Sequence, residues 1–508
     1  MKNRIKQYLL AASMCVGLTA CSDFFEPIPG VQFGLDETFA SKQRTEEYLN
    51  NVYSYVREVT DAIHPNTYGG IFTEASLDGA NRWNKTYAEW TNGSFNSASA
   101  QASEYFSKYY QAIAKASTFI QNVEKCPEAA ASTRGKWKSE ARALRAYYYF
   151  ELLRLYGPIP LIGEDPIPLD ASLEELIKER NSVDECVNFI ATELQSAIDS
   201  GDLLQRAGKA NLGRMDVATC MALKAKLYLY WASPLFNGNT DQASVKNKDG
   251  KQLFPQTEDN SKWAQARDAY ERFMTFATGQ GYKLTEVYTN GKLDPYASCR
   301  AAGEFFTTTW EAVDELIFVK LRDLYDYTYW VCPKFTDFQD TDVTGGGGYY
   351  TTQETVDLFF TKDGLTIEED PGYDKFEGIP GANNFTSGRY YDPNNPSRLY
   401  FDADKSKVLK QWKDREPRFY VNITYSGSIW LNEGKYNEEM RTDFTNGANG
   451  TCGKSKASGD CPDSGYLIRR GAKASNNNGS KHFSPVLRLA DMYLGYAEAL
   501  CMCSDLDN

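Results

Sequence analysis

Apolar residues recur along this chain at the spacing of one face of an α-helix. Residues three and four positions apart share a helix face, so such a run predicts a helix packed against a core on one side. Four runs follow this spacing: Tyr109, Ile113, Ala116, Ile120 and Val123; Leu144, Tyr148, Leu152 and Leu155; Val183, Val187, Ile190, Leu194 and Ala197; Val486, Ala490, Tyr493, Ala497 and Leu500. The pattern predicts a mainly α-helical protein.

Small and large residues alternate within the predicted helices, as in residues 140–150 and 218–228. Alanine on one turn lets a neighbouring helix come close, and tyrosine on another fills the groove, which is typical of tetratricopeptide-like helix pairs. No fixed repeat period is present, so we expect such pairs embedded in a larger body. Helices are predicted to end at Gly157 and before Pro234. We expect Trp137 and Trp263, on helical faces, to be packing residues.

Two long segments, 236–259 and 362–413, are rich in Gly, Asn, Asp and Pro and are predicted to be loops. Loops of this length in a compact domain are usually functional or disordered. The run Gly345–Gly348 lacks the lysine and the Ser/Thr of a phosphate-binding loop and follows no apolar strand. It is predicted to be a flexible loop.

The first 21 residues have the pattern of a lipoprotein signal peptide. Three basic residues precede an apolar stretch from Tyr8 to Ala20, and small residues stand directly before Cys21. The stretch is too short to span a bilayer. We therefore expect cleavage before Cys21 and lipidation of that cysteine, which would hold the mature protein on a membrane. A soluble secreted protein is the less favoured alternative.

The amino-acid composition argues against two classes of protein, nucleic-acid-binding proteins and zinc hydrolases. The net charge of −13 and the absence of a dense Lys/Arg run argue against nucleic-acid binding. Two histidines, His64 and His482, lack a nearby ligand cluster, and no zinc spacing is present, so a zinc hydrolase is not expected. Nine cysteines remain after Cys15 and Cys21, an odd number. Cys452 and Cys461 are the best candidates for a local disulfide.

Several strings, in this order, resemble the SusD/RagB family of nutrient-binding surface lipoproteins of Bacteroidetes. They are residues 138–160 (KSEARALRAYYYFELLRLYGPIP), 222–230 (ALKAKLYLY), 314–318 (DELIF), 362–364 (KDG), 415–420 (REPRFY) and 486–500 (VLRLADMYLGYAEAL). The resemblance implies a SusD-like α-helical scaffold with four tetratricopeptide-like helix pairs and long loop-rich insertions. The ligand would be captured without a cofactor and passed to a TonB-dependent outer-membrane transporter of the SusC type.

The resemblance also implies a location and an organisation. The lipoprotein would sit on the outer face of the outer membrane, with Ser22, Asp23 and Glu26 in its tether. We divide the chain into a signal peptide (1–20), an N-terminal helical region (21–235), connecting loops and a helix (236–310) and a C-terminal region (311–508). Family members usually continue beyond the last helical string, so the C-terminal region is expected to be incomplete or to lack part of its packing.

A glycan site needs aromatic faces surrounded by amide, guanidinium or carboxylate groups. Three turn-rich or alternating segments have this mixture, and Trp83 is the strongest single candidate because its segment has no helical periodicity. The candidate ligand-binding residues are Asn81, Arg82, Trp83, Trp90, Tyr327, Tyr329, Trp330 and Tyr349. Most aromatic residues in a protein are core residues, so each candidate competes with plain burial.

Other functions stay open at this point. A glycoside hydrolase needs two carboxylates about 5 to 10 Å apart across a cleft, which sequence does not show. Acidic runs such as Glu174–Glu175 and 368–370 are expected to be solvated faces. Calcium on Asp337 to Asp342 is less favoured than solvated acids. A peptide-binding family member and a periplasm-facing protein-binding scaffold are further alternatives, and the identity of the nutrient is not readable.

Overall fold

The computed structural model describes most of the chain beyond the N-terminal segment. The described residues are 34–56, 76, 79–82, 89, 93–165, 167, 171–303, 314–322, 330–335, 345–375, 378–430, 440–445, 451–453, 460–470, 472 and 482–504. The signal peptide, Cys21 and the acidic run from Asp337 to Asp342 lie outside them, and so does His64.

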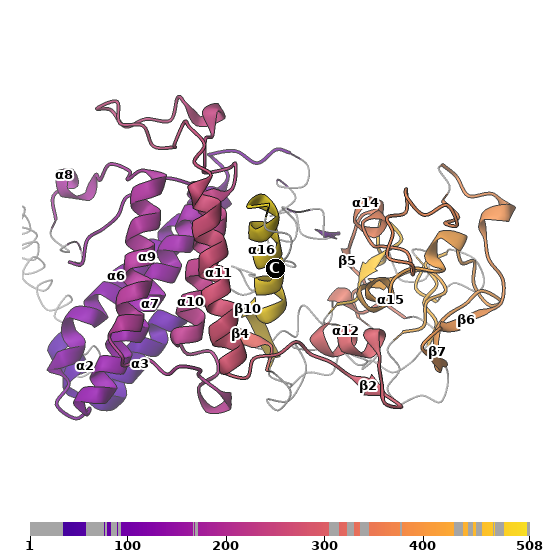
Figure 1. Cartoon of the computed structure of the whole chain (residues 1–508), viewed down its shortest axis with the longest axis horizontal. Coiled ribbons are helices and arrows are strands. Elements are labelled where there is room, and N and C mark those ends of the chain that lie inside the picture. The colour runs from indigo at the N-terminus through magenta and orange to yellow at the C-terminus, as the bar shows by residue number, and fades with distance from the viewer. Residues whose placement is uncertain are drawn as a thin grey trace, which may run out of the picture.

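The chain forms a helical part and a loop-rich lobe, which lie side by side in Figure 1. The α-helices are α2 (Leu35–Ala40), α3 (Lys42–Tyr53), α6 (Ala100–Asn122), α7 (Ala131–Tyr156), α8 (Leu173–Leu176), α9 (Val183–Asp199), α10 (Val217–Ala232), α11 (Ser261–Gly279), α12 (Pro295–Gly303), α14 (Gln353–Asp357), α15 (Pro417–Asn422) and α16 (Leu489–Met502). The strands are β1 (Ala80–Asn81), β2 (Tyr288–Thr289), β3 (Lys292–Leu293), β4 (Leu316–Arg322), β5 (Tyr349–Tyr350), β6 (Arg389–Asp392), β7 (Asn395–Asp402), β8 (Ile423–Thr424), β9 (Leu467–Ile468) and β10 (His482–Arg488). The predicted mainly α-helical class is confirmed.

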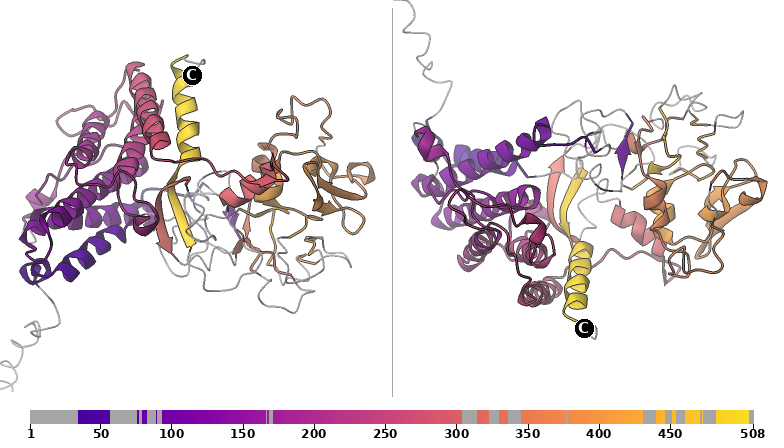
Figure 2. Two further views of the ribbon diagram at one scale, coloured as in Figure 1. Left: turned by 60° about the horizontal axis from the view of Figure 1, so that its bottom comes forward. Right: turned by 90° about the horizontal axis from the view of Figure 1, so that it is seen from above.

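Each long helix packs against the next long helix along the chain. α6 packs on α7, α7 on α9, α9 on α10, α10 on α11, and α11 on α16. Figure 2 shows these helices grouped as one body, with the C-terminal helix at its edge facing the lobe. Stacked helix pairs inside a larger molecule are what the alternation of alanine and tyrosine predicts.

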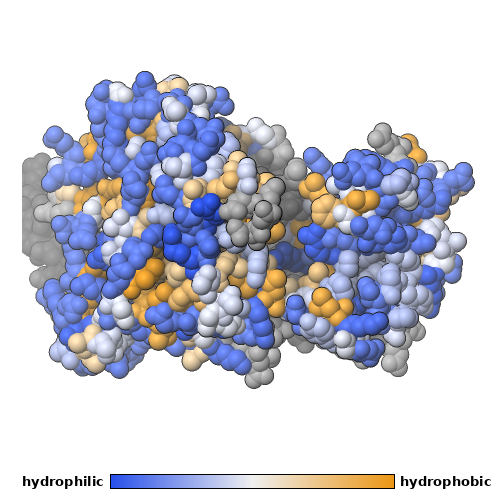
Figure 3. Space-filling model, viewed as in Figure 1, coloured by the Kyte–Doolittle hydropathy of each residue, from blue (hydrophilic) through white to orange (hydrophobic). Residues whose placement is uncertain are grey.

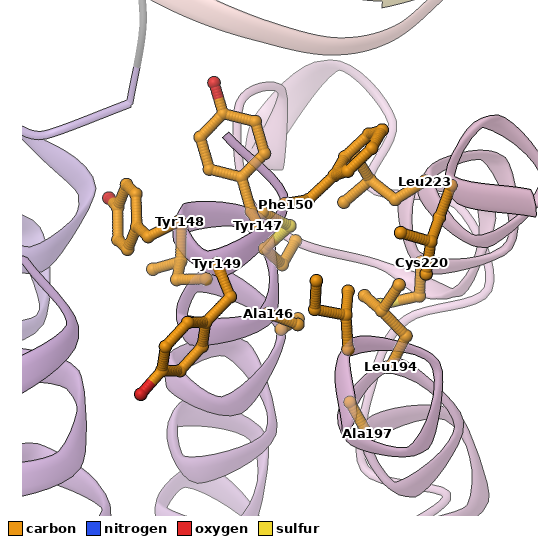
Figure 4. Packing of buried hydrophobic residues seen from close by; sticks show 14 of the residues in the cluster. Ala146, Tyr147, Tyr148, Tyr149, Phe150, Leu194, Ala197, Cys220 and Leu223 are labelled. Atoms are coloured by element: carbon orange, nitrogen blue, oxygen red, sulfur yellow. The ribbon is translucent and has the colours of Figure 1, made fainter. Parts of the chain in front are cut away.

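Helix α7 is buried on nearly every side. Its run from Ala146 to Phe150 sends side chains to α6, α9 and α10 at once, as Figure 4 shows for the tyrosines and for Leu194 and Cys220 on the facing helices. A helix buried on nearly every side is a core helix, although α7 also buries charged side chains such as Arg145. The buried hydroxyls still find partners: Tyr148 donates to the Val52 carbonyl at 2.5 Å and Tyr149 to the Ile162 carbonyl at 2.8 Å.

The faces predicted for α6 and α9 are buried as expected, and Trp137 and Trp263 are both 4% exposed. The face predicted for the last helix is wrong except at Leu500, which is buried. Tyr493 is 46% exposed, and the buried positions are Leu489, Met492, Gly495, Ala499 and Leu500. The pattern was displaced because residues 482–488 pair with β4 as strand β10 before the helix begins.

The two predicted loops differ in outcome. Segment 236–259 is mostly irregular, as predicted, with one short 3₁₀ turn and the bridge Lys246–Gln252. Segment 362–413 contains the antiparallel hairpin β6–β7, so predicting only loop there was wrong. The hairpin joins an aromatic core in which the Tyr400 and Tyr420 rings stack with centroids 3.9 Å apart.

Among the described helices, none is long and apolar enough to cross a membrane.

Candidate functional site

The candidate site is built on a small antiparallel sheet whose strands come from four distant parts of the chain. The strand order is β1-β5-β9-β8, so β1 at residues 80–81 pairs with β5 at residues 349–350, and β9 and β8 extend the sheet into the lobe. Each strand has only two residues, so the pairing depends on the neighbouring core more than on its own hydrogen bonds.

This sheet brings together two of the segments singled out in the sequence. Asn81 lies opposite Tyr349, and the backbone N–H of Arg82 donates to the Gly348 carbonyl at 3.1 Å. Gly348 in turn donates to the Trp330 carbonyl at 3.1 Å. Asn81, Arg82, Trp330 and Tyr349 therefore share one region. The other four candidates, Trp83, Trp90, Tyr327 and Tyr329, lie outside the described residues, each in a segment that continues from this region.

The glycine run beside β5 is a buried, hydrogen-bonded strap. Gly345 donates to the Pro333 carbonyl and Gly347 to the Cys332 carbonyl, both at 2.9 Å. Gly347 has φ of +59°, and a Cβ there would lie 3.0 Å from the Asp460 carbonyl oxygen. Gly345–Gly348 is irregular, as predicted for a loop, but it is buried and hydrogen-bonded, and at Gly347 only glycine allows the backbone to pass this closely.

Arg82 is held by the segment that leads into β9. Its guanidinium donates to the Cys461 carbonyl at 3.2 Å and forms an ion pair with Asp463. The Arg82 side chain is 19% exposed, whereas Asp463 is 50% exposed. This arrangement presents a fixed donor and an accessible acceptor side by side, which suits hydroxyl groups that both accept and donate.

The aromatic candidates differ in exposure. Tyr349 is 3% exposed and packs in a core with Trp430, so its ring supports the sheet from beneath. Trp330 is only partly buried against the same core. Sequence reasoning missed Trp430, and it missed Arg469, whose guanidinium lies 5.6 Å from the centre of the Trp430 ring. Burial lowers the pKa of Arg469.

The predicted local disulfide is not formed, since Cys452 and Cys461 are not joined to each other. Different neighbours place the two residues. The N–H of Cys452 donates to the Asp443 carbonyl at 2.9 Å, whereas the carbonyl of Cys461 accepts from Arg82. The spacing of the two cysteines in the sequence did not indicate these hydrogen bonds.

A signal for Asp463 was available in the sequence. The turn Pro462–Gly465 is of a kind that places polar groups at a surface.

Among the hollows that lie away from this sheet, two differ clearly in character. An apolar one of about 440 Å³ in the helical part lies between α6 and the α8 segment and is lined by Phe106, Tyr110 and Ile177 among others. The second, in the lobe, is lined largely by charged residues. Figure 3 shows a mostly hydrophilic face with hydrophobic patches over the helical part. Within the described ranges no cluster of His, Cys, Asp or Glu could hold a metal ion.

Comparison with known proteins places both halves of the chain. Residues 315–508 match the family model described as the SusD family, and residues 32–229 match one described as starch-binding associating with outer membrane. A SusD-like protein of Bacteroides ovatus is 27% identical over 175 residues, which are 33% of this chain and 30% of that protein. The chain therefore aligns with less than a third of the length of that curated relative.

Solved structures share the fold along nearly the whole chain. The protein named BT4246 superposes with a TM-score of 0.73 at 24% identity, covering 92% of this chain and 79% of that one. A SusD-like carbohydrate binding protein from Bacteroides fragilis superposes with a TM-score of 0.60 at 18% identity, covering 92% and 75%. At such identities the likeness establishes the architecture.

Proposed function

Because the chain belongs to the SusD family, we propose that it is a surface lipoprotein that binds oligosaccharides and delivers them to a TonB-dependent outer-membrane transporter. The family is one of glycan-binding proteins, and one matching model is described as starch-binding and associated with the outer membrane. The anchor is the lipid on Cys21, and the ligand face points outward.

The observation that carries the proposal is the pairing of β1 with β5. It joins the polar, tryptophan-containing segment after residue 79 to the aromatic segment before residue 350. Sugar recognition needs aromatic faces for C–H groups and nearby polar groups for hydroxyls. Arg82, Asp463 and Trp330 supply part of this mixture, and Trp83 directly follows Arg82 in the chain.

Binding would proceed without chemistry on the sugar. The ligand is enclosed between the site and the mouth of the transporter, and closure of the lipoprotein over the barrel hands it on. Oligosaccharides are the favoured ligands, and peptides are the alternative within the same family. A periplasm-facing scaffold is disfavoured because the four candidate residues that the structure describes lie at one small sheet rather than along a bare helical groove.

A glycoside hydrolase is the second candidate activity. A general acid for this reaction needs a raised pKa. In the charged hollow of the lobe the opposite holds for Asp370, whose pKa is lowered by hydrogen bonds from the Thr361 side chain and the Gly372 N–H. This carboxyl group is suited to accept hydrogen bonds and not to protonate a leaving group.

The test is titration of the mature chain carrying Cys21→Ser against poly- and oligosaccharides by affinity electrophoresis and calorimetry. We expect binding without release of reducing ends, and Trp83→Ala should weaken it at least tenfold. Tyr493→Ala is the matched control, because Tyr493 is an exposed aromatic residue on α16, away from the sheet.

Release of reducing ends would overturn binding without catalysis. Binding of peptides and of no sugar would move the ligand to the peptide class. An equal loss of affinity in Trp83→Ala and Tyr493→Ala would remove the site from the region of β1 and β5.

A further inference from the structure

The charged hollow of the lobe is a defined pocket away from the sheet. It has a volume of about 260 Å³ and lies between segment 362–374 and segment 410–414. The strings KDG and REPRFY, singled out in the sequence and not used by the site on β1 and β5, meet here: Lys362 N–H donates to the Asp414 carbonyl at 2.8 Å, and Thr361 bridges to Arg415.

Arg415 lies behind the lining of this pocket and holds the lining residue Tyr373. It is 3% exposed, and it donates to the Val356 carbonyl at 2.7 Å and the Phe359 carbonyl at 2.6 Å, which satisfies carbonyl groups at the end of α14. It also donates to the Tyr373 hydroxyl at 2.7 Å, and that hydroxyl donates to the Gln411 carbonyl at 2.6 Å. The two walls are therefore tied together through one buried guanidinium group.

The wall on the other side is also held in place. Asp414 has φ of +56°, a conformation that is uncommon for residues other than glycine. Its carboxylate accepts a hydrogen bond from the Tyr390 hydroxyl at 3.0 Å. Residues that their surroundings hold in such conformations are often found at functional sites. The backbone conformation of Asp414 therefore supports a functional role for the cavity that it lines.

The lining alternates donors and acceptors. Lys362 pairs with Asp363 at 2.7 Å and Lys410 with Asp374 at 3.4 Å, while the Lys413 ammonium lies 5.5 Å from the centre of the Tyr390 ring. Three lysines face four aspartates, counting Asp370 and Asp414. With opposite charges nearly balanced, the pocket favours a neutral ligand whose groups both donate and accept hydrogen bonds over an anion.

We propose that this pocket is a second ligand site, which takes one ring of a neutral polyhydroxylated ligand such as a sugar. Adjacent hydroxyl groups would bridge a lysine and an aspartate, and the half-buried Tyr373 lies beside them as the aromatic wall. The volume lies just below the roughly 300 Å³ at which pockets for larger ligands begin, so the site holds an end or a branch of a chain. The class of ligand rests on the proposed function, whereas the position of the site does not.

The test uses calorimetry on the Cys21→Ser chain with maltohexaose, laminarihexaose and xylohexaose as probes, and inorganic phosphate as an anionic probe. The measurement is made in the Trp83→Ala background, where the site at β1 and β5 is weakened. The pocket variant is Lys362→Ala with Lys413→Ala. The control is Lys405→Ala with Lys407→Ala, which removes the same charge from exposed positions of the same lobe outside the pocket.

We expect Trp83→Ala to retain weak binding of one hexasaccharide, which the pocket variant lowers at least tenfold and the control leaves unchanged. Complete loss of binding in Trp83→Ala alone overturns the second site and leaves the proposed function standing. If the parent chain binds none of the sugars, both proposals fail. Phosphate binding that the pocket variant removes, with no sugar effect, overturns the neutral ligand.

Discussion

The helical part and the loop-rich lobe each hold an arginine between acidic or polar partners, but the two arginines differ in burial. In the helical part Arg145 on α7 is fully buried, pairs with Glu193 on α9 at 2.6 Å and donates to Ser117 on α6 at 3.0 Å. In the lobe the Arg398 side chain is 20% exposed and joins Asp294 and Asp392, from different segments.

The difference shows what holds each region together. Regular helices already have their backbone hydrogen bonds, so Arg145 only links neighbouring helices that pack through apolar faces. Irregular segments of the lobe do not form such regular backbone hydrogen bonds, so charged side chains bond to some of the backbone groups instead. Arg415 does this for carbonyl groups at the end of α14. The hollows follow the same division, apolar in the helical part and charged in the lobe.

The largest effect is expected from Arg145→Met. It leaves the Glu193 carboxylate, 6% exposed, with only the longer ion pair to Arg142 at 3.5 Å, and losing the main partner of a buried charge costs about 3 kcal/mol of the free energy of unfolding. Urea unfolding measures the loss, and hydrogen exchange should place it in α6, α7 and α9. Lys125→Met is the control, since its ion pair with Asp36 is exposed and contributes less than about 1 kcal/mol.

Arg398→Met should cost less, about 2 kcal/mol, because the Arg398 side chain is partly exposed and the two buried carboxylates that it leaves each keep a hydrogen bond from a backbone N–H, that of Ala297 or Asn394. Faster exchange should be confined to α12 and the β6–β7 hairpin. Loss of protection from hydrogen exchange in α7 as well would show that the two regions unfold as one unit. This result would contradict the expected difference between them.

The two regions should also respond to pH with opposite sign. Burial raises the pKa of Asp216, which caps α10, to about 6, so its contribution to stability is complete below about pH 4 and is lost as the pH rises to 6, by about 2 kcal/mol. Hydrogen bonds from Arg398 lower the pKa of Asp294 to about 2, so its contribution is lost as the pH falls from about 4 to 2.

Asp216→Asn should flatten the pH profile of unfolding between pH 4 and 6, and Asp294→Asn should flatten it only below pH 4. The profile is measured by urea unfolding at each pH. An unchanged slope between pH 4 and 6 in Asp216→Asn would contradict the assignment.

The smallest effect is expected from Gly495→Ala on α16. A Cβ at this position would lie 2.2 Å from the Tyr270 hydroxyl of α11, so the tyrosine must move, at a cost of about 1 kcal/mol. Tyr270→Phe combined with Gly495→Ala should recover part of the loss in thermal unfolding. No recovery would mean that the ring of residue 270, whose Cζ would lie 2.5 Å from the new Cβ, sets the limit and not the hydroxyl.

Prediction from sequence worked where structure is local. The spacing in α6, α7 and α9 identified buried faces because each helix forms its own hydrogen bonds. Prediction failed at Val486, which lies in strand β10 paired with β4. It also failed at Tyr390 and Tyr400, which form a hairpin in a segment rich in turn residues. For the candidate site, the sequence supplied residue types and segments, but the pairing of Asn81 with Tyr349 has no local signal.

The pairing of β1 with β5 also has a consequence for how the protein matures. Its two strands lie at residues 80 and 350, and the sheet is extended by β9 at residue 467. Contacts between such distant residues form slowly, because a long loop must close before they contribute. A chain that emerges from its N-terminus can pack α6 to α11 early, whereas the sheet of the site needs residues up to 468, and α16 joins the helical part after that. The sheet that carries the candidate site is therefore complete only when almost the whole chain has been made.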